Sequence, residues 1–465
     1  MKKIITGICA LAGTLSFAQN KYDYQYPSNA INLYSQDINS GNAKYIGVGG
    51  AVGALGSDIN AVEQNPAGLG VSVVSDLQIT AGVSGYNNKS SFGTNYKESD
   101  NKFNFQQFGG NFVFQNPGSD WNRFSIGVAY YNQRIDNTST IGENSNISSV
   151  SSQYDGTFAG YYKNIDGYKS KFSLNFGSSY DDRLYLGLGL NFHETNYSSY
   201  EQYYEKDATD GKNYGYNLDG FPYNENGQGF SFSLGAIYKV DQSFRLGAAY
   251  HSPVWYNLTT EYFSFNNSFN STNGTVNSYN LYYSDYNLTR GGRFVGSLGF
   301  VVGKSLSLGL DYTYHMNNDT KLKPNNLFIP SNNFINDFVK NSSEVRLGAE
   351  YRVDKFKVRA GYNYVASPFK DFSIDLADTN NQVTTTNLSQ AFVGDVNRAS
   401  FGVGYDFGGF YLDAAYQYQT QKYKQLIGGG NYIDSNNSYV QLPNTYAVNT
   451  KLNSNLFLLT LGWQF

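Results

Sequence analysis

The chain contains almost no cysteine. Its 465 residues include one, Cys9, which lies in a short apolar stretch directly after Lys2 and Lys3. A basic start, a short apolar core and small residues at its end are typical of a secretory signal peptide, so we expect residues 1–18 to be removed before Gln19. The mature chain then has no cysteine, which excludes disulfides, cysteine–metal sites and cysteine nucleophiles.

Charge and long apolar runs are also scarce. Charged residues make up 15% of the chain, against about 25% in a usual soluble domain. The formal net charge is −4, and it becomes −6 once Lys2 and Lys3 are removed, so no basic field recruits nucleic acid. No apolar run after the signal is long enough for a membrane-spanning helix. Such an exported chain is periplasmic, secreted, or an outer-membrane β-barrel.

Aromatic residues and glycine are abundant instead. The chain has 43 Tyr, 33 Phe and 49 Gly, with a mean hydropathy of −0.46. This combination is typical of a transmembrane β-barrel. From about residue 71 apolar residues recur at every second position, as in the segment 398–407, where apolar residues alternate with polar or small ones. Such alternation predicts strands with one apolar and one polar face.

About fourteen strands are predicted, an even number as in bacterial barrels. Their connections alternate between short turns and long segments rich in Asn, Ser and Tyr. A soluble sandwich also alternates along its strands, but it has no reason to alternate its connections in this way. The expected strands are 71–86, 101–115, 121–133, 171–180, 183–195, 229–240, 243–256, 288–302, 304–316, 342–352, 355–365, 397–407, 409–420 and 452–465. The expected long connections are 134–170, 196–228, 257–287, 366–396 and 421–451.

The segment before the strands, residues 19–70, has a different character. Ile31, Tyr34 and Ile38 recur at helical spacing and predict a short helix. Residues 46–57 are rich in Gly and Ala and predict no strong regular element. The expected organisation is therefore a signal peptide (1–18), an N-terminal hatch of short helices (19–70) that fills the lumen, and an all-β barrel (71–465).

The end of the hatch carries two structural signals. Asp58 is a good N-cap for a short helix. Asn65 precedes Pro66 and is therefore biased away from helical geometry, so the helix should end there. We expect Gly68 to allow a sharp turn into the first strand.

Charged residues fall on the polar face of four consecutive strands. Such charges are costly unless they are paired or hydrated. We expect them to line the lumen as a structural network that anchors the hatch, and a substrate path is the alternative. They are Arg346, Glu350, Arg352, Lys357, Arg359, Arg398, Asp406 and Asp413.

The chain has three histidines, His193, His251 and His315, each late in an expected strand and facing the lumen. They are weak candidates for a haem site, because no cysteine or carboxylate cluster accompanies them. Lumen lining is the preferred interpretation, with no metal and no cofactor. No nucleophile, base or close acid pair stands out, so we expect no enzyme.

One stretch has a family resemblance. The run from Gly49 to Leu69, with Asn65-Pro66-Ala67-Gly68 near its end, resembles the N-terminal hatch of FadL-type outer-membrane transporters of hydrophobic compounds. Two shorter stretches, 250–253 and 359–362, are similar to strand-end motifs of that family. Long Asn- and Tyr-rich loops and a very Gly-rich hatch place the sequence nearer to the branch called haemin receptors.

The resemblance implies a passive importer of hydrophobic molecules, such as long-chain fatty acids or aromatic hydrocarbons. Asp58, Asn65, Pro66, Ala67 and Gly68 would then be the gating residues. The resemblance also implies a location in the outer membrane of a Gram-negative bacterium, contacts with its lipids, and a monomer. The terminal aromatic, Phe465, resembles the signal that the barrel assembly machinery reads. The alternatives are a cargo carrier in type IX secretion and a haemin receptor.

Overall fold

The computed structural model describes residues 25–148, 156–217, 221–265, 269–270, 275–276, 279–303, 305–377, 382–433 and 439–465. The expected signal peptide, with Cys9, lies outside the described residues. No helix in the described part of the chain is both long and apolar enough to cross a membrane.

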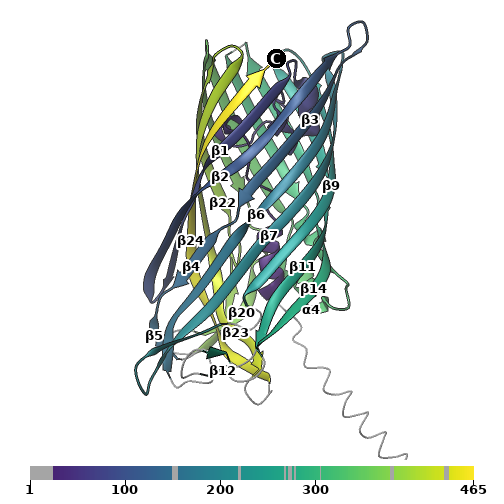
Figure 1. Cartoon of the computed structure of the whole chain (residues 1–465). Helices are drawn as coiled ribbons and strands as arrows, with labels where there is room; N and C mark the ends of the chain where they lie inside the picture. Colours follow the sequence, from purple (N-terminus) through teal and green to yellow (C-terminus); the bar gives the residue numbers. More distant parts are fainter. Residues whose placement is uncertain are drawn as a thin grey trace, which may run out of the picture.

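Fourteen antiparallel strands close into a barrel, with the last strand paired to the first (Figure 1). Every predicted strand coincides with one strand of this ring, so the strand count is confirmed. The ring consists of β1 (Asp76–Phe92), β2 (Thr94–Gln115), β3 (Trp121–Arg134), β6 (Gly156–Tyr180), β7 (Leu184–Asp207), β9 (Tyr223–Lys239), β10 (Phe244–His251), β15 (Arg293–Val302), β16 (Leu306–His315), β18 (Ser342–Val353), β19 (Phe356–Val365), β22 (Val396–Asp406), β23 (Phe410–Ile433) and β24 (Tyr439–Gln464).

Most of the short turns and the C-terminus lie at one end of the barrel, the upper end in Figure 1, which we call the turn end. The one-residue turn at Gly93, between β1 and β2, lies at the opposite end. The opposite end is the loop end. Shorter elements extend the wall there: β4 (Asn137–Ile141), β5 (Asn144–Ser148), β8 (Asn213–Asn217), β11 (Val254–Phe265), β14 (Tyr279–Arg290) and β17 (Lys321–Lys323). Two hairpins, β12–β13 (Phe269–Asn270, Thr275–Val276) and β20–β21 (Phe372–Ala377, Val383–Leu388), form separate small sheets.

The predicted long connections are partly wrong. Much of 134–170, 196–228, 257–287 and 421–451 is strand, because β6, β7, β23 and β24 run for 24–26 residues each and because β11 and β14 extend into 257–287 from its two ends. These extensions carry Asn, Ser and Tyr on both faces. They therefore lack the apolar alternation that identifies the parts of the strands nearer the turn end. The wall also breaks at Ser252-Pro253, where β10 gives way to β11, because proline cannot donate a ladder hydrogen bond.

The apolar face of the wall points outward. In β15 buried and exposed positions alternate, with Arg293, Val295 and Ser297 inside and Phe294 and Leu298 exposed. This is the reverse of a soluble protein, in which the apolar face is buried. An outward apolar face with a polar interior is the arrangement of a membrane barrel.

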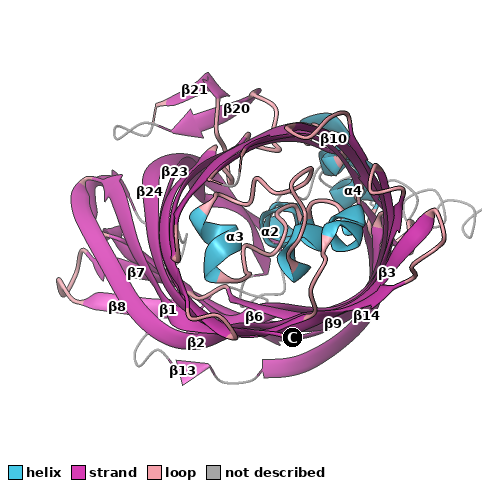
Figure 2. Cartoon of the chain, turned by 90° about the horizontal axis from the view of Figure 1, so that it is seen from above, coloured by secondary structure: helices cyan, strands magenta, loops and turns pink. Residues whose placement is uncertain are grey.

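Residues 25–72 lie inside the ring, as the view along the axis shows (Figure 2). We call residues 25–72 the lumen segment. It contains α2 (Gln25–Tyr34), α3 (Ala43–Gly47) and the 3-10 helices η2 (Ile59–Glu63) and η3 (Pro66–Val71). The short helix predicted from Ile31, Tyr34 and Ile38 is therefore confirmed for the first two, whose side chains are buried, whereas Ile38 lies beyond its end. Two further helices, η4 (Asn317–Asp319) and α4 (Ile329–Phe338), belong to the connection between β16 and β18.

The predicted transition from hatch to wall is wrong in one detail. Gly68 makes no sharp turn into a strand; it lies within η3, and the first strand begins at Asp76. Pro66 explains the difference, because a proline at the first helical position starts a helical turn as readily as it ends the preceding one.

Candidate functional site: the lumen segment and its wall contacts

Three polar side chains define the local structure of the lumen segment by capping its short helices. Asn42 Oδ1 accepts from Tyr45 N at 2.7 Å at the start of α3. Asp58 Oδ1 accepts from Asn60 N at 2.8 Å, which confirms its expected capping role. Asn65 Oδ1 accepts from Ala67 N at 3.0 Å at the start of η3. Each cap satisfies a backbone donor that a short helix would otherwise leave unpaired.

Two rows of glycine on the inner wall hold the backbone of this segment. Across β6, β7 and β9, Gly177 pairs with Gly187, which pairs with Gly235. Across β15, β16, β18 and β19 a second row is formed by four glycines in direct register, Gly299, Gly309, Gly348 and Gly361. We call these two sets the glycine rows.

The lumen segment lies directly against the glycine rows. A Cβ atom at Gly361 or Gly348 would come within 3.0 Å of the backbone of Gly49 or Val48. A Cβ at Gly187 would come equally close to the backbone of Ala67. Backbone therefore packs on backbone here, which only glycine allows. The sequence shows many glycines, but their alignment becomes visible only once the strand register is known.

Side chains of the wall bind the same segment through hydrogen bonds. Asp311 Oδ2 accepts from Val52 N at 3.1 Å and from Gly53 N at 3.0 Å. Arg346 Nη1 donates to Tyr45 Oη at 2.9 Å, and Arg245 Nη1 donates to the Leu55 carbonyl at 2.7 Å. The bonds of Asp311 and Arg346 are buried, whereas the bond between Arg245 and Leu55 is partly buried. Losing Asp311 would leave Gly53 N without water or partner.

The predicted gating motif also meets the wall. Asn65 Nδ2 donates to the Ala236 carbonyl at 3.0 Å and to the Ala248 carbonyl at 3.4 Å, so it touches β9 and β10 together. Pro66 and Ala67 lie against Gly187, and both are buried. Asp58 instead binds within the segment, where both carboxylate oxygens accept from Asn42 Nδ2 at 3.0 Å.

The predicted lumen charges fall into two groups. Arg359 is buried and pairs with Glu350 at 2.6 Å and with Asp413 at 2.9 Å. Arg398 is buried too, and donates to Asn363 Oδ1 at 2.6 Å. The second group lies at the turn end and contains Arg352, Lys357 and Asp406. Arg352 Nη2 is 3.9 Å from Glu350 Oε1, and Lys357 Nζ is 3.5 Å from Asp406 Oδ2.

Several charged contacts of the lumen segment were not predicted from the sequence. Asp37 pairs with Arg293 and, at 2.6 Å, with Arg290. Glu63 pairs with Lys171 at 2.5 Å. The acids lie in the N-terminal segment and the cations in distant strands, so no local spacing pattern connects them.

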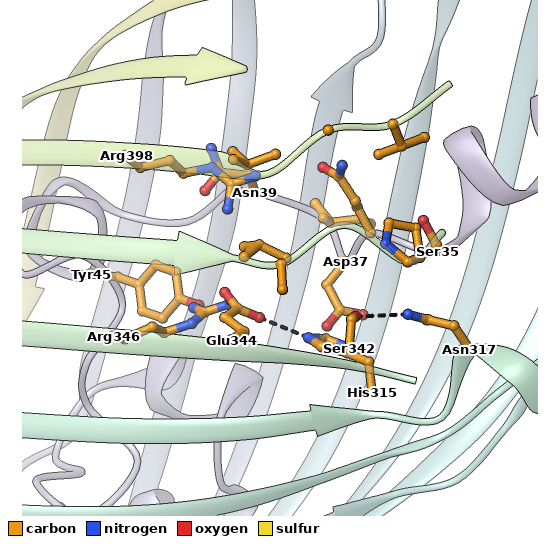
Figure 3. A pocket seen from close by; sticks show the side chains of 18 residues that line it. Ser35, Asp37, Asn39, Tyr45, His315, Asn317, Ser342, Glu344, Arg346 and Arg398 are labelled. Atoms are coloured by element: carbon orange, nitrogen blue, oxygen red, sulfur yellow. Dashed lines mark hydrogen bonds and ion pairs between the residues drawn. The ribbon is translucent and has the colours of Figure 1, made fainter. Parts of the chain in front are cut away.

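Figure 3 shows the pocket between Asp37, Asn39 and the wall. His315 Nε2 lies 2.9 Å from Glu344 Oε2, and Arg346 Nη2 pairs with the same carboxylate at 2.5 Å. Aliphatic side chains such as Val365 and Val396 form the opposite side. The cavity measures about 30 Å³, room for water but not for an organic ligand. This pocket is therefore too small for the proposed kind of ligand in this conformation.

The three histidines do not form one site. His193 Nε2 is bonded to Ser231 Oγ at 2.8 Å and His251 Nε2 to the Gln64 carbonyl at 3.1 Å. His315 is engaged with Glu344. No group of three or more His, Cys, Asp or Glu suited to a metal ion occurs among the residues that the structure describes.

Helix α2 occupies the loop end of the lumen and packs through side chains. Ile31 and Tyr34 lie in an apolar cluster with Tyr256, Tyr286 and Phe334, the last of which belongs to α4. The Tyr34 and Tyr256 ring centroids are 4.9 Å apart. Burying Ile31 and Tyr34 contributes about 1.5–3 kcal/mol each.

One buried carboxylate fastens this helix. Glu225 accepts hydrogen bonds from the phenols of Tyr34 at 2.5 Å, Tyr223 at 2.6 Å and Tyr286 at 2.6 Å. Burial, with the neighbouring carboxylate, raises the pKa of Tyr34 well above its ordinary value. The phenol therefore keeps its proton and acts as the donor.

The wall has a seam between β2 and β3. Their ladder ends at Gln107–Tyr131, and β2 continues toward the loop end paired with β1 alone. Beyond that point side chains join the two sides, as where Lys102 Nζ lies 2.8 Å from Asp166 and 3.4 Å from Asp136. A cavity of about 120 Å³ lies at the seam, lined by Asn39 of the lumen segment among others.

No protein-family model and no curated protein matches the sequence. Solved structures do match. A FadL homologue of Pseudomonas aeruginosa is 15% identical, with 92% of this chain and 98% of that chain covered and a TM-score of 0.55. The toluene transporter TodX of P. putida is 12% identical, with 92% and 99% covered and a TM-score of 0.54. The fold is that of the FadL-type barrels. The monoaromatic hydrocarbon channel CymD is similar as well, at 12% identity, 91% and 97% coverage and a TM-score of 0.53.

Proposed function

We propose that the protein is an outer-membrane channel for the passive uptake of hydrophobic small molecules, such as long-chain fatty acids or monoaromatic hydrocarbons. The supporting observation is the division of the lumen. At the turn end the lumen segment fills the barrel against the glycine rows, and at the loop end α2 covers an apolar, aromatic-lined cluster. An open polar porin has no use for either feature.

The apolar outer wall supports the membrane location. On β24, Trp463, Leu459 and Phe457 are exposed on the outward face. The apolar stretch from Phe457 to Phe465 covers about 20 Å along the barrel axis, close to the band of roughly 25 Å expected of outer-membrane barrels. Assembly through the terminal Phe465 and a monomeric state stay predictions.

The proposed route starts at the loop end. An apolar molecule takes the place of the α2 side chains on the aromatic cluster. Because one buried apolar contact is exchanged for another, binding alone shifts the equilibrium and no energy source is needed. It then leaves the lumen through the seam, where few main-chain hydrogen bonds have to break. The gating role of Asn65, Pro66 and Ala67 in this route is a prediction from the family resemblance, supported by their contact with β9 and β10.

Uptake of radiolabelled oleate and toluene by cells that lack their own FadL-type transporters tests this proposal. Because residues 10–465 contain no cysteine, Lys102→Cys with Asp136→Cys can be joined across the seam by a short bis-methanethiosulfonate crosslinker, which forms a disulfide to each thiol with loss of methanesulfinate. We expect the crosslink to reduce uptake at least tenfold and its reduction to restore uptake.

The matched control joins Asn87→Cys to Asn453→Cys, which face each other across the continuous ladder between β1 and β24. That crosslink should leave uptake unchanged. The proposal fails if neither probe is taken up above the empty-vector level, and the seam route fails if the crosslink has no effect.

A further inference from the structure

Four lysines stand side by side on the outer wall. Lys97 of β2 is paired in register with Lys89 of β1. Lys89 is paired on its other side with Lys451 of β24, and Lys451 with Lys422 of β23. Lys424 follows two residues further along β23, on the same face. We call the first four residues the lysine row.

The row faces away from the lumen. Lys89, Lys97 and Lys422 are exposed, whereas Ser90 and Thr450, one residue away, are buried on the inner face. Within the described part of the chain no carboxylate lies within ion-pair distance of any of these lysines. Like charges directly opposite each other on neighbouring strands destabilise a sheet. The arrangement therefore costs free energy unless an anion from outside the chain neutralises it.

A groove of about 730 Å³ surrounds the row. The four lysines line it together with Lys424, Tyr96 and Gln390, and no acidic residue is among its lining residues. The hairpin β20–β21 lies outside the ring beside β23 and β24 and packs on their outer face (Figure 2). The segment that follows this hairpin supplies the edge of the groove: Lys424 N donates to the Gln390 carbonyl at 2.9 Å.

The position along the barrel axis indicates what the groove meets. Phe103 and Phe457 are exposed on the same outer face, six residues nearer the turn end than Lys97 and Lys451. Polar residues, including Asn87 and Asn453, lie between. Six residues of strand span about 20 Å, or about 15 Å along the axis of a tilted barrel. The lysine row thus lies beyond the apolar band on the side of the loop end, at the level expected for lipid headgroups.

The concentration of positive charge is a local property of the lysine row. The chain as a whole carries 33 basic and 37 acidic residues and is net negative. A general attraction of the surface for anions therefore does not explain the row. Clusters of basic residues beside a membrane bind anionic lipid headgroups.

We propose that the lysine row binds the phosphate- and carboxylate-bearing saccharide headgroup of a glycolipid of the outer leaflet, that is, lipopolysaccharide. This proposal rests on the outer-membrane location in the proposed function, but not on the transported compound. A bound headgroup would hold four strands and the edge of the β20–β21 segment together at the loop end.

The test uses the full mature chain in neutral detergent, titrated with phosphorylated rough-type lipopolysaccharide. Bound lipid is counted by native mass spectrometry, and the melting temperature is followed. We expect the combined substitution Lys89→Gln, Lys97→Gln, Lys422→Gln and Lys451→Gln to weaken binding about tenfold or more. Without lipid the same variant should melt no lower than the parent, because the substitution removes like-charge repulsion.

The matched control removes four exposed lysines of the loop end that lie outside the row, Lys206, Lys212, Lys321 and Lys323. It changes the net charge equally and should bind lipid as the parent does. Replacing the row with arginine should retain binding.

Two further probes distinguish the sources of the anion. Dephosphorylated lipopolysaccharide should bind more weakly than the phosphorylated form, and inorganic phosphate should not compete at equal concentration. Equal binding by the parent and the glutamine variant would overturn the proposal, as would full competition by inorganic phosphate. Uptake of oleate and toluene, measured separately on the same variants, reports on the proposed function, so the two ideas can fail independently.

Discussion

The two ends of the lumen segment are held in opposite ways. At the turn end residues 47–70 pack backbone to backbone on the glycine rows, with Asp311 and Asn65 bonding to main-chain groups. At the loop end α2 packs through the side chains of Ile31 and Tyr34 on other aromatic side chains. A backbone contact on glycine has one geometry, whereas an apolar side chain can be replaced by an apolar ligand of similar size. We therefore infer that a ligand of the proposed channel would displace α2 rather than residues 47–70.

The largest effect should come from filling a glycine row. Gly361→Val places a branched side chain where the backbone of Gly49 lies, so the lumen segment must leave the wall. We expect the barrel to fold, because its outer face is unchanged, and to conduct ions in planar bilayers at least tenfold more than the parent. Gly296→Val is the control, since a Cβ atom there meets nothing within 4 Å. An unchanged conductance in a folded Gly361→Val protein would show that the row is not what seats the segment.

A smaller effect should follow from Asp311→Ala. The substitution leaves Gly53 N buried without its acceptor and leaves Val52 N with the Gly50 carbonyl alone. We expect it to cost about 3 kcal/mol of local stability, visible as faster amide hydrogen exchange in residues 50–55. Asp311→Asn keeps an acceptor and should exchange more slowly than the alanine variant. Identical exchange in all three proteins would contradict the role assigned to this carboxylate.

Tyr34→Phe tests how α2 is held at the loop end. It removes one hydrogen bond to the buried Glu225 carboxylate, a loss of about 1.5–3 kcal/mol. We expect faster hydrogen exchange in α2 and unchanged exchange in α3, together with tighter binding of an apolar ligand, because α2 competes less well. Tyr282→Phe, on an exposed tyrosine, is the control. Equal acceleration in α2 and α3 would mean that the two ends are not independent.

The smallest effect is expected at the resemblance motif. Asn65→Ala removes the cap of η3 and the bonds to β9 and β10, a loss of about 1 kcal/mol. We expect a two- to fivefold change in oleate uptake with little change in melting temperature. Asp58→Ala removes a comparable cap without a wall contact and should leave uptake near the parental rate. Equal uptake by both variants would separate Asn65 from gating.

Much of the fold follows from local sequence, and much of the site does not. The outward faces ending in aromatics located all fourteen strands, and the spacing of Ile31 and Tyr34 located α2. The loop-end parts of β6, β7, β23 and β24 are not predicted because their two faces are equally polar. The glycine rows, the pairing of Asp37 with Arg290 and the lysine row all depend on strand register, which joins residues far apart in the chain. Local periodicity carries no information about that register.

We propose that ligand binding moves α2 while residues 47–70, which pack on the glycine rows, stay in place. Because residues 10–465 contain no cysteine, two pairs of spin labels can test it by pulsed electron paramagnetic resonance. Asn32→Cys with Ser99→Cys reports on α2, and Ser57→Cys with Ser119→Cys reports on the turn end, all at exposed positions. We expect saturating oleate or toluene to shift the first distance and to leave the second unchanged. A shift of the second distance, or no shift in the first, would contradict it.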